Sequence, residues 1–363
     1  MRRGAFAGVV LGGVLALCLE ASPAMALGPS LWDRARYPEI GAQAALIDEA
    51  EQLQIRYHRL FSADRGERLD ARDLMTLGEA YLSRATDLLE QAGVAKGGDP
   101  LVRLRLADLY ELLHKNDESR LLLESIAGSN PPAVVMARVQ SQLAICYAKL
   151  GRHAEEIKAY GEALALQPIA EHRALLLANR AEAYMVEGDV SAAVEGYRSA
   201  LLLLTPYDMV NGNGPTTLWG LAVALDRSGD FAGAIEAVTM ARTYDARDLR
   251  LNSPNWFYVP DYDRHWYEAL GHWMAARKTD TASVRADAYL RAVASWKEYV
   301  SKAPLGDHWV LIAKARLAQC EKEAAEARRQ AKVPLGLASK GRPSIAPGGT
   351  KAPAPPRAVA PKR

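Results

Sequence analysis

The feature of this chain that most restricts its fold is an internal repeat of 37 residues. The residues that recur at this spacing are Tyr110, Tyr147 and Tyr184; Ala107, Ala144 and Ala181; Leu106 and Leu143; and Pro131 and Pro168. Self-similarity at such a period is typical of a repeat array, in which each unit buries its apolar face against its neighbours. Because such an array needs no single core, about 300 residues can fold as one elongated body.

Each repeat contains a glycine turn followed by a helix with small residues on one face. The clearest unit runs from Gly188 to Ala200 and reads GDVSAAVEGYRSA, and the turn glycine recurs at Gly151 and Gly229. Glycine suits the left-handed backbone at the end of a helix, and small side chains let two helices approach closely. The pattern therefore predicts pairs of antiparallel helices.

This unit resembles the tetratricopeptide repeat. The A-x-x-x-F element of that family matches Ala193 with Tyr197, and its L-G-x-x-Y element matches Leu77-Gly78 with Tyr81. Further matches are Ala234 with Val238, Ala292 with Trp296, Leu143-Ala144 with Tyr147, Leu221-Ala222 and Leu270-Gly271. The resemblance implies an all-α, tetratricopeptide-repeat superhelical solenoid, and composition adds a disordered C-terminal tail; the alternative is an unrelated helical bundle.

The resemblance covers residues 71–305 and is clearest over 137–248. We expect repeat units near 100–133, 137–170, 174–207, 215–248 and 264–304, with about three extra residues in each inter-repeat loop relative to the family. The expected segments are a signal peptide (1–26), an N-terminal helical cap or degenerate repeat (27–99), the solenoid (100–305) with an aromatic insertion (245–263), a C-terminal capping helix (306–333) and a disordered, basic, proline-rich tail (334–363).

The N-terminal residues have the order of a secretory signal peptide. A basic start is followed by an apolar stretch from Ala5 to Cys18 and by small residues before a cleavage point after Ala26. The stretch is shorter than the roughly 20 residues of a membrane-spanning helix. The alternatives are an uncleaved anchor and a lipoprotein at Cys18, where the preceding Leu17 is too large for the lipidation motif.

Charge is divided between an acidic body and a basic tail. Residues 27–327 contain 34 basic and 42 acidic side chains, whereas residues 328–363 contain nine Lys or Arg and no Asp or Glu. The tail after Val333 also contains seven prolines and few apolar side chains, which predicts disorder. Such asymmetry is typical of an interaction tail, here one that binds anionic membrane or polymer surfaces.

Catalytic motifs are missing from the sequence. It contains no H-E-x-x-H, G-x-S-x-G, G-x-x-x-x-G-K-[ST] or C-x-x-C pattern. We therefore expect a protein that is not an enzyme, needs no cofactor or metal, and binds no nucleic acid. Cys146 is expected to be a buried, unreactive thiol. The alternative is a metal-dependent accessory or enzyme centred on His265 and His272, which are seven residues apart.

The resemblance also implies where a partner binds, because the first helix of each tetratricopeptide repeat lines the concave face. Carried over position by position, the predicted binding residues are Arg138, Gln142, Asn179, Glu182, Trp219, Arg227, His265, Glu268 and His272. The lysine and asparagine that hold a peptide carboxylate in the chaperone-binding members are absent here. We therefore do not expect a C-terminal chaperone peptide as ligand.

A second candidate surface is rich in aromatic residues. Seven of the 18 residues from Trp256 to Trp273 are aromatic, against 7% in the whole chain. Trp256, Phe257 and Tyr258 lie in the 245–263 insertion, and aromatic rings often anchor protein interfaces. The alternative is that the insertion packs on its own solenoid.

These observations together predict a periplasmic scaffold or adaptor that binds other envelope proteins or peptides. The repeat resemblance implies protein binding, and the signal peptide implies secretion across the inner membrane. A further alternative is an envelope-surface tether that acts through the basic tail.

Overall fold

The computed structural model describes residues 30–60, 70–252 and 258–332, and the regular secondary structure of these residues is helical throughout. The predicted signal peptide and tail lie outside the described residues. The α-helices are α1 (Leu31–Arg36), α2 (Pro38–Leu60), α3 (Ala71–Gln91), α4 (Pro100–Leu112), α5 (Asn116–Gly128), α6 (Ala133–Lys149), α7 (His153–Leu166), α8 (Ala170–Val186), α9 (Val190–Leu203), α10 (Pro206–Asn211), α11 (Gly214–Arg227), α12 (Phe231–Tyr244), α13 (Arg264–Lys278), α14 (Ala282–Lys302) and α15 (Val310–Lys332). Short 3₁₀ helices precede α4 (η2, Val94–Lys96) and α13 (η3, Asp261–Asp263).

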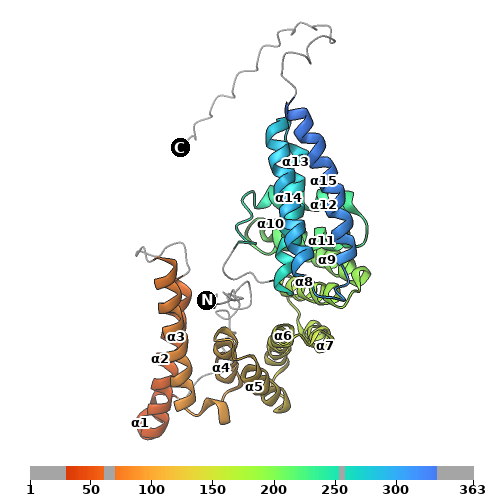
Figure 1. The fold of residues 1–363 in the computed structure, drawn as a ribbon. Coiled ribbons are helices and arrows are strands. Elements are labelled where there is room, and N and C mark those ends of the chain that lie inside the picture. Colours follow the sequence, from red (N-terminus) through yellow and green to blue (C-terminus); the bar gives the residue numbers. More distant parts are fainter. Residues whose placement is uncertain (1–29, 61–69, 253–257, 333–363) are drawn as a thin grey trace, which may run out of the picture.

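Helices follow one another as packed pairs, from α2 with α3 to α13 with α14 (Figure 1). The turn glycines Gly151, Gly188 and Gly229 have φ values of 69°, 86° and 96°, in the left-handed region that favours glycine. After two of these turns an aspartate caps the next helix, because Asp189 accepts from the Ala192 amide and Asp230 from that of Gly233. The predicted all-α repeat fold is therefore confirmed.

Small residues bring neighbouring pairs into close contact. Ala181 and Ala193 are fully buried between α8 and α9. A Cβ atom added to Gly220 of α11 would lie 2.4 Å from the ring of Tyr197 on α9. The large ring thus fills the space that the small residue leaves, as ridge-and-groove packing requires.

The connections between repeats differ from the expected long loops. Only residues 129–132 connect α5 to α6, and only 167–169 connect α7 to α8. The extra residues of the 37-residue period therefore lie in the helices, and α6 and α8 have 17 residues each. Farther along, the short helix α10 occupies the connection between α9 and α11.

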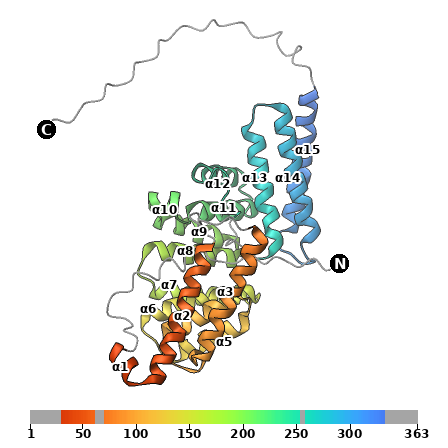
Figure 2. The ribbon, with the colours of Figure 1, turned by 90° about the vertical axis from the view of Figure 1, so that its left-hand side faces the viewer.

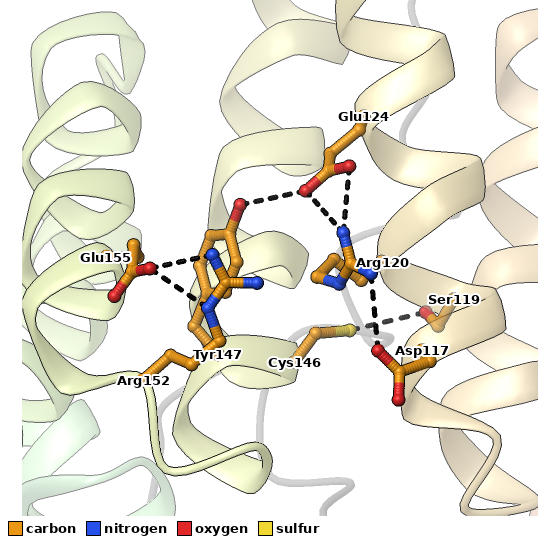
Figure 3. A network of polar contacts seen from close by, with 8 residues as sticks. All are labelled: Asp117, Ser119, Arg120, Glu124, Cys146, Tyr147, Arg152 and Glu155. Atoms are coloured by element: carbon orange, nitrogen blue, oxygen red, sulfur yellow. Dashed lines mark hydrogen bonds and ion pairs between the residues drawn. The ribbon is translucent and has the colours of Figure 1, made fainter.

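Polar contacts join the helices around the α6–α7 turn (Figure 3). Arg120 of α5 bonds Glu124, whose carboxylate accepts a 3.2 Å hydrogen bond from the Tyr147 hydroxyl of α6. The guanidinium of Arg152 lies 4.8 Å from the centre of the Tyr147 ring. Cys146 is fully buried beside Ser119, and burial raises the pKa of its thiol to about 12. This unreactive environment agrees with the sequence-based expectation for Cys146.

Two segments extend the array at its ends. At the N-terminal end, α2 and α3 lie side by side in both views (Figures 1 and 2), so residues 71–91 belong to a helix pair. At the C-terminal end, α14 packs against both α13 and α15, and the three form a bundle. Among the described residues, no helix has both the length and the apolar character that crossing a membrane requires.

The buried residues form two hydrophobic clusters. The N-terminal cluster extends from Ala50 to Leu176, and the C-terminal cluster from Ala174 to Ala327. They meet at α8, which contributes Leu176 to the first and Ala181 to the second. The first helices α4, α6, α8 and α11, named the first-helix row below, run through both clusters.

Candidate functional site

The first-helix row starts with a group of charged side chains between α4 and α6. Glu111 of α4 forms an ion pair with Lys149 of α6. Asp108, one helical turn before Glu111, is 9% exposed and interacts electrostatically with Arg138 of α6. Burial raises the pKa of the Asp108 carboxyl group to about 7, although the nearby Arg138 guanidinium opposes this shift.

Gln142 lies on the same face of α6, between Arg138 and Lys149. Its side chain is 7% exposed, and neither amide atom has a hydrogen-bond partner among the described residues. Leaving a buried amide group unpaired costs about 1–3 kcal/mol. This amide is covered by neighbouring side chains, so a bound molecule could contact it only if those side chains moved.

The next first helix, α8, contributes Asn179 and Glu182. Both side chains are half-buried, and Asn179 interacts with the hydroxyl group of Tyr160 of α7. Burial first, and then the negative charges of Glu156 and Asp263, raise the pKa of the Glu182 carboxyl group to about 8, although the Arg227 guanidinium opposes this shift. Desolvated, like-charged carboxyl groups with raised pKa values are more common at functional sites than elsewhere.

Trp219 and Arg227 of α11, two further predicted binding residues, lie in the protein interior. Trp219 is 2% exposed and packs against Tyr267, with ring centres 6.2 Å apart. Arg227 is 3% exposed, bonds Asp263 at 2.8 Å, and lies 4.5 Å from the ring centre of Trp266. Their side chains already contact this chain, so a partner could reach them only if the surrounding residues moved.

A second buried ion pair adjoins this one and was not predicted from the sequence. Asp226, fully buried, accepts hydrogen bonds from Arg316 of α15 at 2.7 Å and from the Trp266 indole at 2.9 Å. The indole of Trp309 donates to the backbone oxygen of Met185 at 3.0 Å. The contacts of Arg316 and Trp309 attach α15 and the residue before it to α11 and α8 across 90 and 124 residues of sequence, which no local pattern reveals.

The predicted histidine pair does not converge on a metal-like site. His265 is buried, and its two ring nitrogens lie 3.0 Å from Glu268 and 2.8 Å from Lys302. His272 is half-buried, and burial lowers the pKa of its imidazole. In the described part of the chain, no group of three His, Cys, Asp or Glu side chains could hold a metal ion.

The aromatic insertion is described only in part. Trp256 and Phe257 lie outside the described residues. Tyr258 is half-buried, and its ring meets that of Tyr267 edge to face at 5.1 Å. The rings of Trp266 and Trp273 on α13 are fully buried. The aromatic residues of α13 therefore belong to the core.

Asp108, Glu111 and Lys149 belong to this row but were not predicted as binding residues. The repeat could have identified Asp108, because Asp108, Ile145 and Glu182 occupy equivalent positions at 37-residue spacing. Its burial and raised pKa, however, depend on how closely α4 and α6 pack.

Comparisons with known proteins found structural likeness only. No protein-family model matches the chain, and no curated protein matches it. A solved structure of MamA AMB-1 has a TM-score of 0.40 and 18% identity, covering 57% of this chain and 98% of MamA. The apo form of the quorum sensor NprR from B. thuringiensis has a TM-score of 0.42 and 14% identity, covering 79% of this chain and 82% of NprR. A further MamA structure has a TM-score of 0.39, 13% identity and coverage of 51% and 99%. We derive no function from these distant likenesses.

Proposed function

We propose that this chain is an exported, tetratricopeptide-type scaffold or adaptor that binds other proteins of a cell-envelope assembly through its first-helix row. The observation that supports this most directly is the unpaired amide of Gln142 beside Arg138. Among the described residues Arg138 has no hydrogen bond or ion pair, and it is only half-buried. A buried polar group without a partner calls for an explanation, and a partner would reach the covered Gln142 amide only if neighbouring side chains moved, whereas Arg138 is partly exposed.

Export is part of this proposal and depends on the sequence alone. Residues 5–18 are apolar and precede small residues at the proposed cleavage point after Ala26, which supports secretion across an inner membrane into a periplasm. Intact-mass analysis of protein from the envelope fraction tests it. A retained N-terminus, or a lipid mass on Cys18, would contradict it.

Site-specific crosslinking tests the binding proposal. A photo-crosslinking amino acid is placed at Arg138 or Asn179 of the first-helix row, and in matched cells at Glu195 or Arg198 on the exposed side of α9. We expect the row positions to capture a defined partner in intact cells, which mass spectrometry then identifies. Equal capture from α9, or capture from α9 alone, would contradict the use of the first-helix row.

The basic tail supports a second function, that of an envelope-surface tether. Nine Lys or Arg without an acidic neighbour attract anionic head groups, and this attraction weakens as salt shortens the screening length to about 8 Å. Vesicles with and without anionic lipid, incubated across a salt series with full-length and tail-deleted protein, distinguish the two functions. Equal binding by both proteins would exclude the tether.

A further inference from the structure

The repeat array has two edges, because successive helices run antiparallel and their connections alternate from one side to the other. The turns within repeats form one edge. The connections between repeats, with the helix ends that flank them, form the other edge, which is named the inter-repeat edge and comprises residues 129–134, 165–170 and 202–213. Because α5 packs on α6, α7 on α8, and α9 on α11, these three connections follow one another in a single row.

Charged residues are divided unequally between the two edges. The turns within repeats expose charged side chains, among them Lys115, Arg152, Asp189 and Asp230. At the inter-repeat edge, residues 125–137 and 163–170 contain no Asp, Glu, Lys or Arg. Residues 199–225 contain one charged residue, Asp208, and its side chain is buried. Because 24% of the whole chain is charged, the inter-repeat edge is depleted of charge.

Large apolar side chains are exposed along this uncharged edge. Leu202 is 86% exposed and Tyr207 is 71% exposed. The exposed apolar residues of all three connections are Val134, Leu166, Ile169, Leu202, Tyr207 and Val210. A row of exposed apolar side chains without charge is uncommon on a monomeric protein and is typical of an interaction site.

Prolines and a helix cap fix the shape of this edge. Each of the three connections contains at least one proline, namely Pro131 and Pro132, Pro168, or Pro206. At the start of α10, the Asp208 carboxylate accepts a 2.8 Å hydrogen bond from the Thr205 amide, and the Thr205 hydroxyl accepts one from the Asp208 amide. A surface that is ordered before binding loses less conformational entropy on association.

The charge of the chain favours a second copy as the molecule that covers this edge. Residues 27–327 contain 34 basic and 42 acidic side chains, so the folded bodies of two copies repel each other except where their surfaces are uncharged. A lipid surface suits this edge less well. Lipid-binding faces combine apolar side chains with Lys or Arg, and the uncharged segments contain neither.

We propose that two copies of this chain associate through their inter-repeat edges around a two-fold axis. Such an interface uses the same patch on both copies. In an antiparallel register of the two rows, the middle connection, residues 165–170, lies opposite itself. The connection at residues 129–134 then lies opposite residues 202–213 of the second copy. Ile169, which is exposed in the middle connection, is therefore the residue closest to the axis.

Opposite charges at the axis test this arrangement. Ile169→Asp and Ile169→Lys each place like charges opposite one another, so each variant should dimerise at least about ten-fold more weakly than the wild type. When the two variants are mixed, an aspartate faces a lysine and a heterodimer should form. Light scattering after size-exclusion chromatography measures the mass over a concentration series, with protein purified from the envelope fraction. A mass tag on one variant identifies the heterodimer.

The matched control is Leu121→Asp, which places the same charge on an exposed leucine of α5 outside the inter-repeat edge. It should leave the dimer dissociation constant within about two-fold of the wild type, and the circular dichroism of all variants should match the wild type. A wild-type monomer at every concentration, an equal effect of Leu121→Asp, or a variant mixture that stays monomeric would overturn the proposal. Vesicle binding by a wild-type monomer that Ile169→Asp abolishes would also overturn it and identify lipid instead.

Discussion

The two hydrophobic clusters of this protein consist of different types of residue. The N-terminal cluster contains mainly leucine and alanine, and its buried rings are Tyr57, Tyr110 and Tyr160. The C-terminal cluster contains five buried tryptophans, and two buried ion pairs lie within it. These tryptophans are Trp219, Trp266, Trp273, Trp296 and Trp309.

This difference follows from how each region buries its surface. In the N-terminal cluster each helix pair repeats the small and aliphatic residues of the pair before it, so contacts are local. In the C-terminal cluster, Arg316 and Trp309 of the last segment reach back to Asp226 and Met185. The comparison suggests a C-terminal unit that depends on a few specific contacts and an N-terminal unit with distributed contacts.

The largest effect should come from Arg227→Ala, which leaves the Asp263 carboxylate buried without its partner. Removing one member of a buried ion pair costs about 3–5 kcal/mol. The buried tryptophans lie only in the C-terminal cluster among the described residues, so their fluorescence should report unfolding of that region. In a denaturant titration of this variant, the unfolding midpoint followed by tryptophan fluorescence should be well below the midpoint followed by far-ultraviolet circular dichroism.

The control for this variant is the double substitution Arg227→Met with Asp263→Leu. Replacing both charges with apolar groups should recover most of the lost stability, because no uncompensated charge remains. Coincident fluorescence and circular dichroism midpoints in Arg227→Ala would show that the two clusters unfold as one unit.

Leu109→Ala provides the corresponding test in the N-terminal cluster. Leu109 is fully buried, and truncating a buried leucine costs about 2–5 kcal/mol. We expect a loss in the lower part of this range, because contacts in this cluster are distributed over many side chains. The unfolding midpoint followed by circular dichroism should fall, whereas the midpoint followed by tryptophan fluorescence should stay near its wild-type value. A larger shift in fluorescence than in circular dichroism would contradict the division between clusters.

Glu182, located where the clusters meet, should make stability fall with rising pH. Its folded-state pKa of about 8 is above the ordinary value of about 4.3, so the folded state retains the proton over this range. The stability that the protonated form contributes is complete below the ordinary pKa and is lost as the pH rises toward 8. Glu182→Gln should therefore raise the melting temperature at pH 8.5 and change it little at pH 4.5. The same change at both pH values would rule out this titration.

The smallest effect is expected from the exposed ion pair between Arg84 and Glu49, which joins α3 to α2 at 3.5 Å. Both side chains are about half exposed, and exposed pairs contribute about 0–1 kcal/mol. Arg84→Gln should shift the melting temperature by no more than a degree or two at physiological salt. A loss as large as that of Leu109→Ala would mean that this pair holds the N-terminal helices in place.

The sequence by itself determined the helical repeat, because the 37-residue period records contacts between neighbours. The small residues at Ala144 and Ala181 and the turn glycines at Gly151 and Gly188 recur wherever one pair packs on the next. The resemblance to the tetratricopeptide repeat implied that Gln142 and Glu182 belong to one row of first helices. The period also contained the signal for Asp108, which is equivalent to Glu182.

Only the tertiary structure decided which members of the row remain available to a partner. Trp219 and Arg227 occupy predicted binding positions, yet the C-terminal bundle covers them. Asp263 ends the nonrepeating insertion and Tyr267 follows it, so the period contains no information about their contacts with Arg227 and Trp219. Burial and pKa depend on everything that packs around a side chain, including segments such as α15 that are distant in sequence. For that reason, the raised pKa of Glu182 and the unpaired amide of Gln142 became visible only in three dimensions.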